Sequence, residues 1–302
     1  MAELLNDTID FSAYLEETDA EHRVIKASSY VDDVVEYYHS ETPVRGDVMP
    51  WEKTHAEMRF RLGEVTLWGG MNGHGKSLVL GQTCLGFISQ GSKVCIASME
   101  MKPLITLARM CRQAQAIYKP DVAFIHEFHK RTDGFLWLYD QQGTVKAKMM
   151  LAVIRYCAEK LKVNHFVIDS LMKCGIGEDD YNGQKAFLDS LTSIARDTGI
   201  HLHLVAHSRK AKDEYTLPGK MDVKGTGAIT DQVDNVLTVW RNKKKEEQRV
   251  AGTAVHTEPD ALVICDKQRN GEWEGKIGLF FHPGSMQFMS DCNATPTRFI
   301  RD

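Results

Sequence analysis

Residues 69–78 read GGMNGHGKSL and lie between an apolar stretch at residues 63–68 and a second, longer apolar run. From Gly70 to Ser77 the spacing is G-x-x-x-x-G-K-S, the pattern of a loop that cradles phosphates between a strand and a helix. Its glycines let backbone N–H groups turn inward, and the start of the helix adds partial positive charge. The alternative, a chance glycine-rich turn, is disfavoured by the complete motif in this context. The stretch predicts a site for a nucleoside triphosphate.

The residues of this loop have separate expected roles. Lys76 is expected to reach the β- and γ-phosphates, and Ser77 is expected to ligate Mg²⁺. The expected cofactors are therefore ATP, or another nucleoside or deoxynucleoside triphosphate, and Mg²⁺. The loop residues expected to bind the nucleotide are Gly70, Asn72, Gly73, His74, Gly75, Lys76, Ser77 and Leu78.

Composition is ordinary for a globular protein, with 302 residues, 43% hydrophobic and 26% charged, and a net charge of −4. A nucleic-acid partner would have to be held by a local basic patch. The seven cysteines form no CxxC pair, which disfavours a zinc ribbon and indicates buried thiols in a reducing compartment. Residues 1–22 hold seven acids and neither Lys nor Arg, unlike a secretory or mitochondrial leader. No apolar run is long enough for a membrane span. We expect a cytoplasmic protein, bacterial or in a host cell if phage-encoded.

The N-terminal region differs from the rest of the chain. Residues 1–22 are acidic and without periodicity, so they are expected to form a loose arm. Residues 29–39 place Val31, Val34, Val35 and Tyr38 on one helical stripe. A polar linker follows at residues 40–50, so this helix cannot bury its stripe by itself. Packing on its own domain and packing on a neighbouring molecule remain equally open. We divide the chain into an arm and linker helix, residues 1–50, and a core domain, residues 51–302.

Strand and helix patterns alternate through the core. Strands are expected at residues 63–70, 93–100, 135–140, 165–169 and 201–207, and helices at residues 77–90, 103–117, 144–161 and 184–198. This alternation predicts a mainly parallel sheet with helices on both faces. After residue 235 the helical patterns stop, and strands at residues 235–241, 261–267 and 276–282 predict an antiparallel end of the sheet.

Two carboxylates end apolar strands. Asp169 could hold Mg²⁺ through water, or it could cap the following turn. Glu100 ends a strand that we expect beside the phosphate-loop strand, where it could polarise an attacking water. Its alternative is a glutamate favoured at a helix N-terminus by the dipole.

Two basic segments follow. Between residues 207 and 234 the cations Arg209, Lys210, Lys212, Lys220 and Lys224 alternate with Pro and Gly. Binding of a nucleic-acid backbone and a solvated surface loop are equally open for this segment. Lys267 and Arg269 lie two residues apart on an extended segment, so both face one side, as a phosphate clamp or as a surface pair.

The order of these motifs resembles the RecA-like motor domain of the DnaB-type hexameric replicative helicases, closest to the Twinkle-like and phage primase-helicase branch. The matching segments are GEVTLWGGMNGHGKSLVLGQ, VCIASMEM, HFVIDSL, LVAHSRK, GTGAITDQVDNVLTVWRN and DKQRNG. The resemblance covers the chain from about residue 24 to residue 290. It implies a RecA-like P-loop core with a mainly parallel sheet, antiparallel strands on its C-terminal side, and a short N-terminal linker helix.

The resemblance also implies roles for single residues. Glu100 falls at the family's catalytic glutamate, Asp169 at the Walker B aspartate and His207 at the γ-phosphate sensor. Lys267 and Arg269 match the cationic pair that reaches the neighbouring subunit's site, with Arg269 as an arginine finger in trans.

Further implications concern ligands and partners. Arg241 is expected near the nucleotide base, and the helix at residues 29–39 is expected to dock on an adjacent protomer. The loops at 209–213 and 220–228 are expected to line a central channel. The residues expected to bind single-stranded DNA there are Arg209, Lys210, Lys212, Lys220, Lys224, Gly225, Thr226 and Gly227.

The function implied is an ATP-dependent replicative DNA helicase, a ring-forming translocase with single-stranded DNA and forked duplex as partners. The ring is expected to be a homo-hexamer, with a separate primase, polymerase or loader as further partners, because the chain contains no primase or zinc-module motif. Two alternatives share the core: a RecA/RadA-like recombinase, disfavoured because no duplex-capturing extra domain is apparent, and a KaiC-like regulatory ATPase that needs no DNA.

Overall fold

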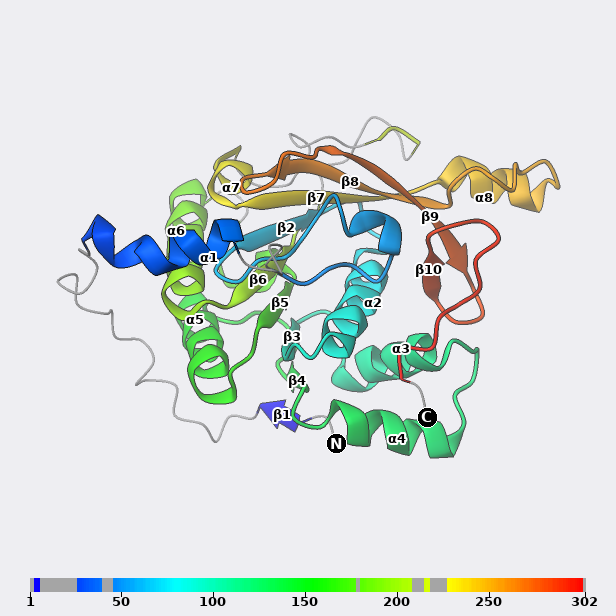
Figure 1. Cartoon of the computed structure of the whole chain (residues 1–302). Helices are drawn as coiled ribbons and strands as arrows, with labels where there is room; N and C mark the ends of the chain where they lie inside the picture. The colour runs from blue at the N-terminus through cyan, green and yellow to red at the C-terminus, as the bar shows by residue number, and fades with distance from the viewer. Residues whose placement is uncertain are drawn as a thin grey trace.

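A single mixed sheet organises the chain. The computed structural model describes residues 3–5, 26–39, 46–177, 180–207, 215–217 and 227–300. Ten strands follow the order β1-β4-β3-β5-β6-β2-β7-β8-β9-β10 (Figure 1). Their bounds are β1 Glu3–Leu5, β2 Val65–Gly69, β3 Val94–Ser98, β4 Leu136–Tyr139, β5 His165–Asp169, β6 His201–Val205, β7 Asn235–Arg241, β8 Ala261–Gln268, β9 Gly275–His282 and β10 Gln287–Met289.

The strand pairing is parallel from β1 to β7 and antiparallel from β7 to β10. This confirms the predicted mainly parallel sheet with an antiparallel C-terminal side. Residues 1–22 were expected as a loose arm, and here the prediction is wrong for residues 3–5, which pair with β4 as an edge strand. The remaining residues of the arm lie outside the described residues.

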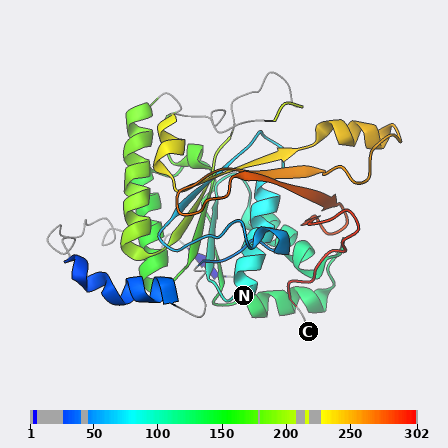
Figure 2. The same ribbon diagram turned by 45° about the horizontal axis from the view of Figure 1, so that its top comes forward.

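Helices cover both faces of the sheet (Figure 2). The α-helices are α1 Val31–His39, α2 Lys76–Ser89, α3 Pro103–Gln115, α4 Val122–Thr132, α5 Ala147–Tyr156, α6 Tyr181–Thr198, α7 Gly227–Gln232 and α8 Lys243–Val250. The 3₁₀ turns are η3 Ala27–Tyr30, η4 Glu52–Thr54 and η6 Leu171–Lys173, and α5 continues as a π-helical segment, η5 Cys157–Leu161. Within the described residues, no helix combines the length and apolar character needed to span a bilayer.

Alternation along the buried strands produces two hydrophobic cores. In β3, Cys95 and Ala97 face the core under α5, α6 and α7, whereas Val94 and Ile96 face the core under α2, α3 and α4. Burying each large aliphatic side chain of this kind contributes roughly 1.5–3 kcal/mol. All seven cysteines are unpaired and all but Cys292 are buried, as expected from their scattered positions.

The prediction that helices stop after residue 235 is wrong, because α8 follows β7. Its N-terminus is capped by the Asn242 side chain, which accepts a hydrogen bond from the Lys245 N–H at 3.0 Å. Lys245 is itself buried and pairs with Asp260 at 2.9 Å. The helix carries no apolar stripe, so its periodicity gave no signal. A cap and an ion pair hold it instead.

The predicted strand order is also wrong at one point. The strand that ends before Glu100 is β3, and two strands, β5 and β6, separate it from the phosphate-loop strand β2. A crossover helix can return the chain to a non-adjacent position in the sheet, and sequence spacing does not reveal how many places are skipped.

The apolar stripe of helix α1 is exposed to solvent. Val31, Val34 and Tyr38 are 59%, 52% and 72% exposed, and the helix contains no buried residue. In Figures 1 and 2 it projects from the body beside the α5 and α6 side of the sheet. Packing on its own domain, one of the two alternatives, is therefore not what the described residues show.

The core under α2 contains a chain of buried polar rings. Trp68 Nε1 donates to His203 Nδ1 at 3.1 Å, His203 Nε2 lies 3.1 Å from His165 Nδ1, and His165 Nε2 lies 2.8 Å from Asp47 Oδ2. An indole N–H can only donate, so His203 must accept at Nδ1. Its Nε2–H then donates to His165, whose own Nε2–H donates to Asp47. The chain is complete with every imidazole neutral.

Candidate nucleotide site

The glycine loop joins β2 to α2 in a conformation that requires glycine. Gly70, Gly73 and Gly75 have φ angles of +144°, +77° and +88°. A Cβ on Gly70 would lie 2.4 Å from the carbonyl oxygen of Val239 on the neighbouring strand β7. Only glycine fits both the angle and the space. The loop is therefore held against β7 while its outer side stays open.

Lys76 is buried at the first position of α2. Its ammonium donates to the carbonyls of Gly70 at 2.9 Å and Met71 at 3.0 Å, which places the charge inside the loop. Burial lowers the pKa of Lys76, while the carboxylates of Asp169 and Glu100 oppose that shift. The ammonium is thus positioned, at a desolvation cost, where a phosphate chain held by the loop would pass.

Ser77 and Asp169 form the oxygen pair predicted for Mg²⁺. The serine hydroxyl donates to Asp169 Oδ2 at 2.6 Å, and Asp169 is 8% exposed at the end of β5. Burial raises the pKa of Asp169, and the Ser77 hydrogen bond lowers it. A hydroxyl and a carboxylate that already meet are hard oxygen donors, and Mg²⁺ is commonly held by one or two such groups together with phosphates and water. The residues present fit this ion.

Glu100 and His207 meet above Ser170. Glu100 Oε1 accepts from the Ser170 hydroxyl at 2.9 Å and lies 3.4 Å from His207 Nε2. The His207 contact, then the Ser170 hydrogen bond, lowers the pKa of Glu100 to about 2, against an opposing effect of burial. Glu100 is therefore a carboxylate at neutral pH, the form that a general base requires.

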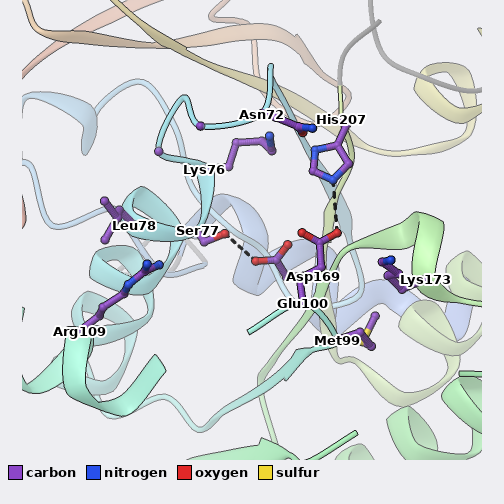
Figure 3. Close-up of a pocket in the computed structure, with 12 residues that line it drawn as sticks. Asn72, Lys76, Ser77, Leu78, Met99, Glu100, Arg109, Asp169, Lys173 and His207 are labelled. Carbon is purple, nitrogen blue, oxygen red and sulfur yellow. Dashed lines mark hydrogen bonds and ion pairs between the residues drawn. The ribbon is translucent and has the colours of Figure 1, made fainter. Parts of the chain in front are cut away.

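These groups line one cavity of about 730 Å³ (Figure 3). Its lining is Asn72, Gly73, Gly75, Lys76, Ser77, Leu78, Met99, Glu100, Arg109, Asp169, Lys173 and His207. Glycine-loop residues from β2–α2 thus face strand-end carboxylates from β3 and β5 and a histidine after β6. The carboxyl ends of parallel strands meet at one edge of the sheet, where α/β folds bind their ligands.

A family model for the AAA domain matches residues 53–213, more than half of the chain and the whole of this cavity's lining. The chain belongs to the AAA-domain family. The chain is 22% identical to the DNA helicase/primase of Enterobacteria phage T3, in a match that covers 76% of this chain and 47% of that protein. The chain therefore spans about half the length of this curated relative.

Two solved structures share the fold. One is an ATPase domain, with a TM-score of 0.72 and 13% identity, in a match that covers 87% of this chain and 97% of that one. The other is a DnaB-like replicative helicase studied with primase, with a TM-score of 0.74 and 14% identity, covering 89% of this chain and 69% of that one. They confirm the fold that the resemblance implied.

Two predicted nucleotide contacts lie behind the glycine loop of the AAA domain. His74 is buried, and its Nδ1 accepts the Arg241 N–H at 3.2 Å. Arg241 pairs with Glu246 and donates to the Gly73 carbonyl at 3.3 Å. A second cavity of about 250 Å³ opens here. Its lining is Gly73, His74, Gly75, Leu78, Arg241, Glu246, Arg249, Asp260, Phe281, Met286 and Phe288.

The cations Lys267 and Arg269 lie outside both cavities. Lys267 donates to the carbonyls of Thr230, Asp231 and Val233 at the end of α7, at 2.7–2.9 Å. Arg269 forms an ion pair with Asp234 at 3.0 Å. Within this one chain they hold the C-terminal end of α7 and do not approach Lys76.

The predicted DNA-binding residues Arg209, Lys210, Lys212, Lys220, Lys224, Gly225 and Thr226 lie outside the described residues. Gly227 begins α7. Of the segment between His207 and α7, the structure describes residues 215–217.

Sequence reasoning missed three residues that line the larger cavity: Met99, Arg109 and Lys173. Lys173 is the last residue of η6, the short 3₁₀ turn that follows Asp169 and Ser170, and Arg109 lies on α3, the helix that follows Glu100. A cation shortly after a strand-end carboxylate was the available signal, but spacing alone did not show which way either side chain points.

Proposed function

We propose that this chain is the ATP-driven motor of a replicative DNA helicase, a ring-forming translocase on single-stranded DNA that unwinds duplex. The observation that carries the proposal is the cavity in which Lys76, the Ser77–Asp169 pair and the Glu100–His207 pair converge. It is supported by the likeness to a phage helicase/primase and by the fold shared with an ATPase domain and a DnaB-like replicative helicase.

Each group has a defined task in this proposal. The loop N–H groups and Lys76 hold the phosphate chain, and Ser77 and Asp169 would hold Mg²⁺, which neutralises phosphate charge when bound. Glu100, held ionised by His207 and Ser170, accepts a proton from the attacking water. His207 touches Glu100 and immediately precedes the basic loop. Loss of the terminal phosphate can therefore alter the position of the loop that we propose holds DNA.

The smaller cavity is our proposed base site. It adjoins the glycine loop through Gly73 and Gly75 and is lined by Phe281 and Phe288, whose ring centroids lie 5.1 Å apart. Aromatic and apolar side chains together with charged groups that include the guanidinium groups of Arg241 and Arg249 suit a planar, polar-edged ring.

The first test is steady-state ATP hydrolysis with and without single-stranded DNA, at low and moderate salt. Strong stimulation by DNA is expected, and a forked-duplex assay and a strand-exchange assay then separate a helicase from a recombinase. Lys210→Ala combined with Lys224→Ala is expected to weaken DNA binding and to flatten its salt dependence by about two phosphate contacts. If the rate of hydrolysis is the same with and without DNA, and the protein also does not bind DNA, the result would indicate a regulatory ATPase.

Arg269→Ala is expected to lower hydrolysis by about 10³-fold while leaving nucleotide affinity unchanged, because an arginine finger acts on the transition state of a neighbour's site. The sharpest measurement mixes two inactive variants. A Lys76→Ala subunit retains Arg269, and an Arg269→Ala subunit retains an intact glycine loop, so mixed rings contain some complete sites.

Partial recovery of hydrolysis on mixing supports action in trans. The alternative is that Arg269 only pairs with Asp234 in its own chain. In that case the Arg269→Ala protein melts at a lower temperature, and mixing restores nothing.

A further inference from the structure

The larger cavity holds two cationic side chains that the proposed mechanism does not use. Arg109 enters from α3 and Lys173 from η6. Together with Lys76 they oppose the carboxylates of Glu100 and Asp169. Before Mg²⁺ binds, a cavity with two carboxylates and Lys76 as its only charged side chains would carry net negative charge, which disfavours a polyphosphate. Arg109 and Lys173 make the net side-chain charge of the cavity positive, and a positive cavity favours a polyanion.

Lys173 is fixed in place by its backbone while its ammonium stays available. Its N–H donates to the Ser170 carbonyl at 3.0 Å, and its own carbonyl accepts from the Val145 N–H at 2.8 Å. In the part of the chain that the structure describes, no oxygen lies within hydrogen-bond or ion-pair distance of the ammonium. Lys267 and Arg269 differ, because carbonyls and a carboxylate already occupy their charged groups.

The position of Lys173 relative to the other groups indicates which phosphate it would meet. In Figure 3, Lys173 lies beside Glu100. Arg109 lies on the opposite side of Glu100 and Asp169, near Ser77 and Leu78. The charge of Lys173 helps to lower the pKa of Glu100, as expected for a nearby cation. In the proposed function, Glu100 contacts the attacking water, and that water approaches the terminal phosphorus atom.

We propose that Lys173 binds the terminal phosphate of the nucleotide from within the same subunit. The inference rests on the proposed function, because it takes Glu100 as the group that faces the attacking water. An ammonium at this point contacts a triphosphate but not a diphosphate. It also stabilises the charge on the phosphoryl oxygens during transfer, before any group from a neighbouring subunit arrives.

The test compares Lys173→Ala and Lys173→Arg with wild type, using Lys148→Ala as the control because Lys148 is a lysine of α5 outside the cavity. Fluorescent ATPγS and ADP are titrated with Mg²⁺, which requires neither DNA nor turnover. Lys173→Ala is expected to lose about 10-fold in ATPγS affinity and less than twofold in ADP affinity. Its kcat is expected to fall about 10²-fold. Lys173→Arg retains the charge and most of both properties.

Several results would overturn the proposal. Equal losses for ATPγS and ADP, with a lower melting temperature in both Lys173 variants, would indicate a structural role. No change in either affinity or in kcat, or an arginine variant as impaired as the alanine one, would also contradict it. Wild-type protein that binds neither nucleotide would refute the proposed function together with this inference. Wild-type binding with an unchanged ATPγS-to-ADP preference in Lys173→Ala would refute only the role of Lys173.

Discussion

Replacing Lys76 with alanine is expected to abolish nucleotide hydrolysis, with a fall in kcat of at least about 10²–10³-fold. The ammonium lies inside the glycine loop, bonded to the carbonyls of Gly70 and Met71, and exchange of these bonds for phosphate contacts requires little movement. No other side chain of the loop is a lysine or arginine. Phosphate release measured at saturating ATP, with single-stranded DNA present, tests this directly.

A matched control separates the chemical effect from general damage. Lys130 is an exposed lysine of α4, and Lys130→Ala should retain wild-type hydrolysis. Lys76→Ala should melt within a few degrees of wild type, because a buried ammonium whose pKa is lowered by burial contributes little net stability. Wild-type turnover by Lys76→Ala would remove the basis of the nucleotide site.

Acidification below neutral pH is expected to unfold this domain at unusually mild values. His165, His201 and His203 are fully buried, and burial lowers the pKa of each, that of His201 to about 3. In the unfolded chain they titrate near a pKa of about 6.5. Below that pH the unfolded state therefore binds more protons than the folded state. The contribution of the neutral histidines to the free energy of unfolding is present above about pH 6.5 and is lost as the pH falls.

The expected size of the effect follows from this proton difference. Each buried histidine contributes a slope of up to about 1.4 kcal/mol per pH unit between its unfolded and its folded pKa, so the three contribute at most about 4 kcal/mol per unit. Asp47 adds to the loss at lower pH. Burial opposes the shift, but its hydrogen bonds to His165 and Ser92 lower its pKa, and that stabilisation also disappears on protonation. Because total stabilities are about 5–15 kcal/mol, unfolding is expected near about pH 5.

Thermal or urea unfolding between about pH 7.5 and 5 measures this slope. His201→Gln removes one buried imidazole and can still bond to Thr66, so it should lower the slope by about a third. His256 is exposed, and His256→Gln should leave the slope unchanged. Equal stability at neutral pH and near pH ~5 would show that the imidazoles are not held neutral in the folded state.

The sequence predicted those parts of the site that depend on local rules. The glycine loop is a contiguous motif, and its required backbone angles follow from Gly70, Gly73 and Gly75 alone. Asp169 and Glu100 could be found because carboxylates at the ends of parallel strands share one edge of the sheet. The cavity brings together nearly all the residues predicted to contact phosphate and metal.

The parts that were missed depend on tertiary placement. Nothing near Lys267 in the sequence reveals that its ammonium would cap α7, 37 residues from Thr230. The backbone of Lys173 is held by a hydrogen bond from the Val145 N–H, which lies far from it in the sequence. The alternation HLHLV predicted β6 correctly, but it did not show that both histidines would be buried.

For the proposed ring of identical subunits, the exposed apolar stripe of α1 predicts a stability that depends on protein concentration. Val31, Val34 and Tyr38 each gain free energy when another surface covers them. Any complex that covers them is favoured by mass action, so the melting temperature should rise with protein concentration. The proposed ring of identical subunits therefore predicts that dilution favours separate chains and that a higher concentration favours the assembly.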